Sequence, residues 1–137
     1  MRLDGRVWKE GGYWLVEIPL LDAMTQGRSR REALEMAGDL VETLAGVGGF
    51  RAYAEHVAGD RIEIGSNDAR QLVALVLRRQ RESHGLSLAE VARRLRAKSR
   101  NTYARYEQGR SAPTIEKLTD LLHAVSDRDV VIRQSEA

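Results

Sequence analysis

Residues 85–109 read GLSLAEVARRLRAKSRNTYARYEQG, and this stretch decides the fold of the C-terminal half. Ser87 is followed three residues later by a glutamate, which is the spacing of a capping box, and apolar residues then recur at helical intervals. This pattern predicts a helix over residues 87–95. A second short helix is expected over residues 100–108, after a turn at residues 96–98 and before a terminating glycine.

The second of these helices begins with side chains that hydrogen-bond phosphates and base edges. A helix that enters the major groove needs an exposed polar start, where Arg pairs with guanine and Asn with adenine, and a buried opposite face. Tyr103 and Tyr106, three residues apart, suit the buried face. A plain helical hairpin with a basic surface would explain the charge but not this polar cluster. We therefore expect a DNA contact formed by Ser87, Lys98, Ser99, Arg100, Asn101, Thr102 and Arg105.

Residues 69–125 resemble the phage-repressor, or Xre-type, helix-turn-helix family. The matching motif positions here are Leu86, Ser87, Glu90, Val91, Ala92, Leu95, Ser99, Thr102, Arg105, Glu107, Gly109, Pro113, Thr114, Ile115 and Leu118. The resemblance implies a structural ion pair, without base contact, between Arg81 of the preceding helix and Glu107. The turn departs from the family, because it looks one residue longer and Arg96 stands where glycine is usual. The register of the recognition helix is therefore open by about one residue.

The N-terminal 65 residues predict a small antiparallel sheet with one packed helix. A glycine pair at residues 11–12 favours a two-residue hairpin, and a capping box opened by Ser29 predicts a helix to about Ala45. The expected strands are Arg6–Glu10, Tyr13–Ile18, Ala23–Gln26, Phe50–Val57 and Arg61–Ile64.

The fold class is therefore α+β, with this sheet unit over residues 1–65 and an all-α helix-turn-helix unit of four to five helices over residues 66–137. The expected helices of the second unit are residues 69–84, 87–95, 100–108 and 114–125. A last short strand is expected at Val130–Arg133, returning to a sheet.

The charge of the chain is divided unequally between these two units. Residues 1–65 hold eight Lys and Arg against eleven Asp and Glu, a net charge of −3, whereas residues 66–137 carry a net charge of +5. This division suggests that the second unit binds a polyanion and that the first has another task, although a solvated surface would also account for it.

Composition excludes several classes of protein. The 137 residues contain no cysteine, so disulfides and thiolate metal sites are ruled out. No apolar run approaches the roughly 18 residues that a membrane-spanning helix needs. Asp4, Arg6 and Trp8 stand where a signal peptide would need an apolar core, so a cytoplasmic protein is expected.

The N-terminal unit also resembles a known pattern. Tyr13, Pro19, Thr25, Gly27, Ser29, Glu32, Ala33 and Ala37 resemble the HicB antitoxin family, in which a strand ends in Pro, a Thr-x-Gly step follows, and a helix opens with Ser/Thr-x-x-Glu-Ala. The resemblance implies a truncated ribonuclease H-like fold that neutralises HicA, a small ribonuclease toxin, and a DNA-binding C-terminal domain. An ordinary dimerisation domain remains the alternative for this segment.

These resemblances imply an antitoxin that represses its own operon. The expected partners are operator DNA, a small basic HicA-like ribonuclease toxin, and further copies of the chain in a homodimer or higher homo-oligomer. An acidic unit suits a basic toxin. The alternative is a stand-alone regulator whose N-terminal unit dimerises or senses a ligand, with Trp8, Tyr13 and Trp14 lining a pocket.

We expect no enzymatic activity, cofactor or metal site. The carboxylates that could serve a nuclease are Glu17, Asp22, Glu35 and Asp39, but a ribonuclease H-like site needs a carboxylate in the middle of the first strand, and Arg6–Glu10 offers only Glu10 at its end. The three histidines, His56, His84 and His123, lie far apart and lack the spacing of metal ligands.

Overall fold

The structure is a computed structural model, which describes residues 1–134. Its N-terminal unit is a five-stranded antiparallel sheet in the order β3-β2-β1-β5-β4. The strands are β1 (Leu3–Glu10), β2 (Tyr13–Ile18), β3 (Ala23–Gly27), β4 (Ala52–Ala58) and β5 (Arg61–Ser66). All five expected strands are present, and β1 starts three residues earlier than predicted. Asp4 and Gly5, both poor strand formers, obscured that start.

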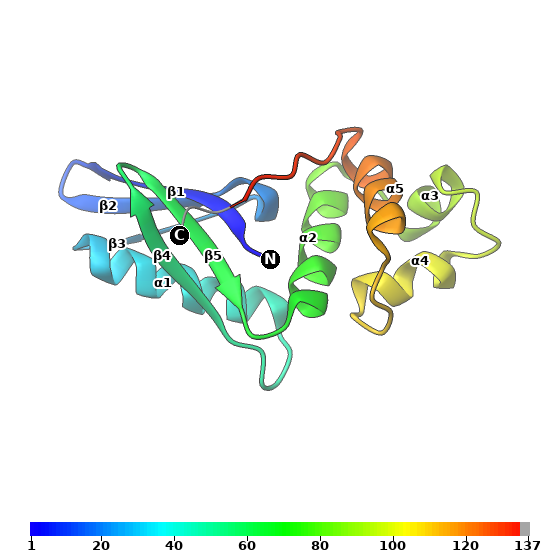
Figure 1. Ribbon diagram of the computed structural model, residues 1–137, viewed down its shortest axis with the longest axis horizontal. Helices are drawn as coiled ribbons and strands as arrows, with labels where there is room; N and C mark the ends of the chain where they lie inside the picture. The colour runs from blue at the N-terminus through cyan, green and yellow to red at the C-terminus, as the bar shows by residue number, and fades with distance from the viewer. Residues whose placement is uncertain (135–137) are drawn as a thin grey trace.

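One face of the sheet is covered by α1 (Arg30–Ala45), as Figure 1 shows. Ser29 caps this helix as expected, because its Oγ accepts a hydrogen bond from Glu32 N at 3.1 Å. The helix approaches β4 closely at Gly38, where a Cβ atom would lie 2.8 Å from the carbonyl oxygen of Ala52. The core between helix and sheet includes Val7, Val16, Ile18, Ala33, Ala37, Val41, Ile62 and Ile64.

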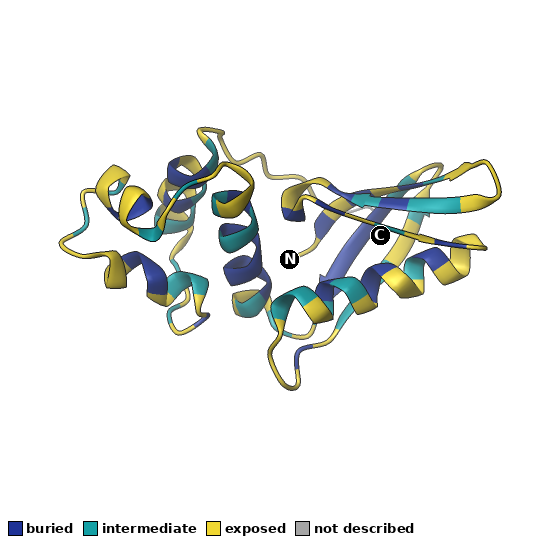
Figure 2. Cartoon of the chain, turned by 180° about the vertical axis from the view of Figure 1, so that it is seen from behind, coloured by how far each residue is buried: buried dark blue, intermediate teal, exposed yellow. Residues whose placement is uncertain are grey.

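The opposite side of the sheet, which we call the outer face, presents the side chains of Asp4, Trp8, Leu15 and Glu63. These residues alternate with inward-facing neighbours such as Val7, Val16 and Ile64 along the same strands. Within residues 1–134 no helix packs on this face (Figures 1 and 2).

The helical unit follows directly. It contains α2 (Ala69–Ser83), α3 (Leu88–Arg94), α4 (Arg100–Glu107) and α5 (Ile115–Ser126). The expected helices lie within two residues of these bounds. Caps explain where the helices begin: the side chain of Asp68 accepts bonds from two backbone N–H groups of α2, and Ser87 and Thr114 cap α3 and α5. The α+β fold class is confirmed.

Helix α2 belongs to two hydrophobic cores at once (Figure 2). Leu72, Leu75 and Val76 are buried against the sheet unit, whereas Val73 and Leu77 are buried against α3, α4 and α5. The opposite sides of one helix therefore join the two units.

The strand expected at Val130–Arg133 is wrong. Residues 127–134 run from α5 back toward the sheet without strand pairing, and Val131 and Ile132 are 87% and 83% exposed (Figure 1). The β-branched residues favour an extended chain, but a strand also needs a neighbour with free backbone groups. The segment crosses the outer face and meets no sheet edge. Residues 135–137 of the expected helical unit lie outside the described residues.

Candidate nucleic-acid interface

The start of α4 is an exposed polar surface. Lys98 lies in the turn before α4, Ser99 is its N-cap, and Asn101 and Arg105 are four residues apart and share one side of the helix. Within residues 1–134, Lys98, Arg100 and Arg105 take part in no ion pair. The exposed set of predicted contact residues comprises Lys98, Ser99, Arg100, Asn101, Thr102 and Arg105, and Ser87 is exposed at the start of α3.

The opposite side of α4 is buried. Tyr103 is fully buried in the core formed by α2, α3 and α5, and Ala104 is 8% exposed. Burial, together with the nearby Glu107 carboxylate, raises the pKa of the Tyr103 phenol far above its ordinary value. Tyr106, the other tyrosine expected to face inward, is half-buried and packs at the edge of the same core. One side of α4 is thus fixed by packing while the other faces solvent.

Arg81 holds the end of α4. Its Nε donates to Glu107 Oε2 at 2.7 Å and its Nη2 donates to Glu107 Oε1 at 3.0 Å, a bidentate pair. A third bond runs from Arg81 Nη1 to the carbonyl oxygen of Leu86 at 2.9 Å. The Glu107 side chain is only 6% exposed. One guanidinium therefore ties the end of α2, the start of the α3 segment and the end of α4 together.

The turn before α4 is a Schellman motif with an arginine in the glycine position. Ala97 N donates to Ala92 O at 2.9 Å and Arg96 N donates to Arg93 O at 3.0 Å, the two bonds of that motif. Arg96 has φ +56°, in the left-handed region. The same paired bonds end α2 and α4, where Gly85 and Gly109 hold this conformation. The long turn of the sequence is therefore an ordinary helix end with an unfavoured residue.

Sequence reasoning missed a row of side chains that joins the two units. Arg78 donates to Leu44 O at the end of α1. Arg79 donates to Leu21 O at 2.7 Å and to Asp22 O at 3.0 Å, and Gln80 Nε2 donates to Leu20 O at 2.9 Å. The carbonyls of Leu20, Leu21 and Asp22 follow β2. They lie in the short 3₁₀ helix η1 (Pro19–Leu21) and directly after it. The only local signal was a run of four long polar residues ending an apolar helix.

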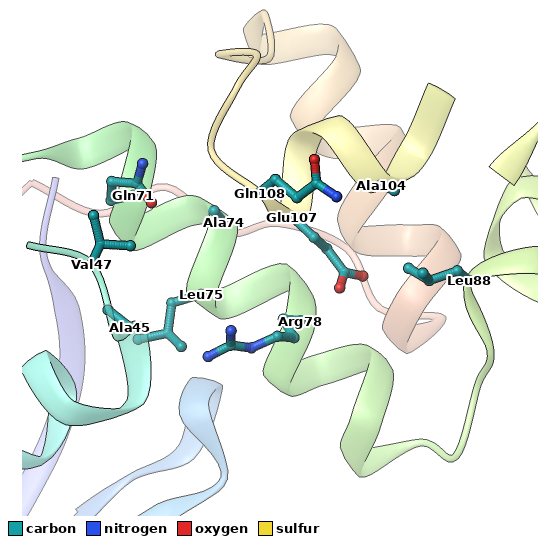
Figure 3. A pocket seen from close by; sticks show the side chains of 10 residues that line it. All are labelled: Ala45, Val47, Gln71, Ala74, Leu75, Arg78, Leu88, Ala104, Glu107 and Gln108. Atoms are coloured by element: carbon teal, nitrogen blue, oxygen red, sulfur yellow. The ribbon is translucent and has the colours of Figure 1, made fainter. Parts of the chain in front are cut away.

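A cavity of about 290 Å³ lies behind α4, between the end of α1, α2 and the end of α4 (Figure 3). Its walls include Val47, Leu75, Arg78, Ala104 and Gln108. At its rim the Gln71 side chain packs against Gly109, where a Cβ atom would lie 2.4 Å from Gln71 Nε2. The cavity thus lies at the junction of the two units and borders α4 on its buried side.

The carboxylates considered for a nuclease do not converge. Glu35 and Asp39 are exposed on α1, Asp22 is exposed after η1, and Glu17 lies on the outer face. Because β1 begins at Leu3, Asp4 does stand within the first strand, contrary to expectation. Within residues 1–134 no three His, Asp or Glu side chains are placed to hold a metal ion.

Residues 77–125 match the protein family described as Helix-turn-helix. The match begins at Leu77 in α2 and ends at Val125 in α5. The helical unit is accordingly a helix-turn-helix domain. The chain is a DNA-binding regulator of transcription. A search of curated proteins found no match to the chain. Within residues 1–134, no helix has the length and apolar character needed to cross a membrane.

Proposed function

We propose that this regulator is an antitoxin that represses its own operon. In this proposal α4 reads operator DNA through Arg100, Asn101 and Thr102, while Ser87, Lys98, Ser99 and Arg105 contact phosphates or base edges beside them. Residues 66–137 form the DNA-binding unit and residues 1–65 the partner-binding unit. Two copies would bind half-sites about one helical turn apart.

The observation that supports the DNA-binding role is that the cationic side chains at the start of α4 form no ion pairs within the described residues. Lys98, Arg100 and Arg105 have no carboxylate partner among the described residues, while the glutamate at the end of the same helix is fully engaged by Arg81. Unpaired cations beside a rigid helix favour an anionic ligand, because their charge is not neutralised within the chain.

The antitoxin role is supported by the order of the two units and by the division of charge. An acidic unit with net charge −3 precedes a basic DNA-binding unit, and its sequence pattern resembles HicB antitoxins. The expected target is a small, basic, HicA-like ribonuclease. Binding of such a toxin would block its contact with RNA, since both would use its basic surface.

Co-expression tests this proposal. The proposal expects a small open reading frame for a basic protein beside the gene. That reading frame is expressed alone, with the wild-type chain, and with a variant that carries Arg100→Ala and Arg105→Ala. We expect growth arrest with the small protein alone and rescue by both versions of the chain, because neutralisation does not need the DNA contact. Failure of the wild-type chain to rescue growth or to co-purify with the product would refute the antitoxin role.

A stand-alone regulator that senses a small molecule is the second candidate, and the cavity behind α4 favours it. At about 290 Å³ this cavity lies at the lower end of the size of small-molecule sites, and α4 forms one wall. A ligand in this cavity would contact α4 directly. If a metabolite and no protein partner changes operator affinity, this second candidate replaces the first.

A further inference from the structure

The outer face of the sheet carries an apolar group that is partly open to solvent, with the Arg6 guanidinium 5.1 Å from the centre of the Trp8 ring. Trp8 on β1 lies directly opposite Leu15 on β2. Tyr13 and Met24, on β2 and β3, are 47% and 56% exposed on the same face. Clustered aromatic and methionine side chains on three adjacent strands are typical of protein-binding surfaces, where they supply most of the affinity.

The same face carries a row of three carboxylates, which we call the acidic row. Asp4 on β1 is paired with Glu63 on β5, and Glu63 is paired with Glu55 on β4. Like charges that face one another across strands destabilise a sheet unless cations neutralise them. The central carboxylate is also almost fully withdrawn from water, because the Glu63 side chain is only 5% exposed. This row therefore requires cations from elsewhere in the chain.

Two arginines supply that charge. Arg2 Nη1 donates to Glu55 at 2.8 Å and to Glu63 at 3.4 Å. Arg133 Nη2 donates to Glu63 at 3.3 Å and also to Asp4. Arg2 directly precedes β1, but Arg133 comes from the irregular segment after α5. The acidic row thus binds a guanidinium that is brought to it from outside the sheet.

The segment that carries Arg133 has little else to hold it there. Val131 and Ile132, the two residues before Arg133, are 87% and 83% exposed and so gain almost nothing from packing. Exposed ion pairs contribute little to stability, and the Arg133 and Asp4 side chains are 42% and 68% exposed. The buried Glu63 keeps its contact with Arg2 Nη1, at 3.4 Å, when Arg133 leaves. A competing arginine, supported by packing on the neighbouring apolar group, would displace Arg133 at small cost.

We propose that the outer face is the docking surface for a basic protein partner. An arginine of the partner takes the place of Arg133 on the acidic row, and an apolar side chain of the partner packs on Trp8 and Tyr13. This inference rests on the proposed function, because the basic partner is the toxin of that proposal. A second copy of the chain is disfavoured as occupant, since residues 1–65 carry a net charge of −3 in both copies and two such units repel each other.

The test compares charge reversals on opposite faces of the same unit. The probe is the small basic protein that the proposed function expects beside the gene, in a catalytically inactive form, and its Kd for the full chain is measured by calorimetry. The double variant Asp4→Lys, Glu55→Lys should bind at least about tenfold more weakly. The control Glu35→Lys, Asp39→Lys makes the same charge change on the exposed side of α1 and should bind within about twofold of wild type.

Two further variants separate docking from folding. Tyr13→Ala removes an exposed ring without changing charge, so it should weaken binding about tenfold and leave the melting temperature unchanged. Arg133→Ala removes the competing guanidinium and should tighten binding about twofold to fivefold. A merely structural role for the acidic row would predict no gain in affinity from Arg133→Ala.

The outcomes distinguish this surface from the function on which it rests. If the wild-type chain binds the probe but the α1 control loses as much affinity as the outer-face variant, the surface is wrong while the antitoxin role stands. If both the charge-reversal variant and Tyr13→Ala bind the probe as tightly as the wild-type chain, the surface is likewise wrong while the antitoxin role stands. If the wild-type chain does not bind the probe, both proposals fall.

Discussion

Glu107 is the last residue of α4, and both of its carboxylate oxygens are bonded to Arg81 on α2, at 2.7 and 3.0 Å. The pair is largely withdrawn from solvent, with 6% of the Glu107 side chain and 15% of the Arg81 side chain exposed. The orientation of α4 therefore depends on a residue 26 positions earlier in the chain.

Removing one member of this pair should make the domain less stable. We expect Glu107→Ala to lower the free energy of unfolding by about 2–4 kcal/mol, because the buried guanidinium loses its partner. Urea titration measures the change. Glu82→Ala is the matched control, since Glu82 is about half exposed and reaches its arginines only at 3.9–4.0 Å, and it should cost less than about 0.5 kcal/mol. Equal losses in the two variants would contradict a structural role for the Arg81–Glu107 pair.

Replacing the arginine in the turn before α4 should have the opposite effect and raise the free energy of unfolding. Arg96→Gly should stabilise the chain by about 1 kcal/mol, because a residue with a Cβ atom at φ +56° carries a steric cost that glycine avoids. Thermal unfolding followed by circular dichroism measures this gain. Arg96→Ala also removes the charge but keeps the Cβ atom, so it should bring no gain. If alanine stabilised as much as glycine, electrostatic repulsion would be the cause and backbone strain would not.

Substitutions on α4 should separate base reading from phosphate binding. Arg100→Ala and Asn101→Ala should each cost about 1–3 kcal/mol on a selected operator sequence and much less on random DNA. Arg105→Ala should weaken binding to all sequences and reduce its dependence on salt, if Arg105 contacts phosphate. Fluorescence anisotropy on both DNAs at two salt concentrations measures these effects. Arg31→Ala is the control, because this residue is 91% exposed on α1, in the other unit. Equal losses on both DNAs for all three α4 variants would reject base reading by this helix.

The bonds from α2 to the loop after β2 should couple the unfolding of the two units. Arg79→Ala removes bonds to Leu21 O and Asp22 O and should cost about 1–3 kcal/mol. We expect the single unfolding transition of the wild-type chain to broaden or divide in this variant, as judged by calorimetry. Arg70→Ala, on the exposed first turn of α2, should leave the transition unchanged. A sharp single transition in the Arg79 variant would show that apolar packing alone couples the units.

Much of the fold could be predicted because its signals are local. Ser29 and Ser87 predicted the starts of two helices, and the glycine pair at residues 11–12 predicted the hairpin. The candidate contact residues of α4 could also be predicted from the sequence, because they cluster in one helical turn. Their predicted contacts with DNA stay predictions until the binding experiments are done.

Other features depended on contacts between distant parts of the chain. Val130–Arg133 has the composition of a strand, but no local pattern tells whether an edge is available to pair with it. The bonds of Arg78, Arg79 and Gln80 go to backbone carbonyls, so the polar run at the end of α2 does not tell which distant segment it contacts. The acidic row likewise emerges only from the pairing of β1 with β5 and of β5 with β4.

The place of α2 in both cores has a consequence for the lifetime of the protein in the cell. Leu72 and Leu77 lie five residues apart on one helix, one in each core. A protease that captures the unfolded sheet unit would therefore also take the first helix from the DNA-binding unit. Truncation at residue 66 would leave Leu72, Leu75 and Val76 facing water. We expect repression and partner binding to disappear at the same rate during degradation, so that the regulator is cleared from its operator whenever its N-terminal unit is destroyed.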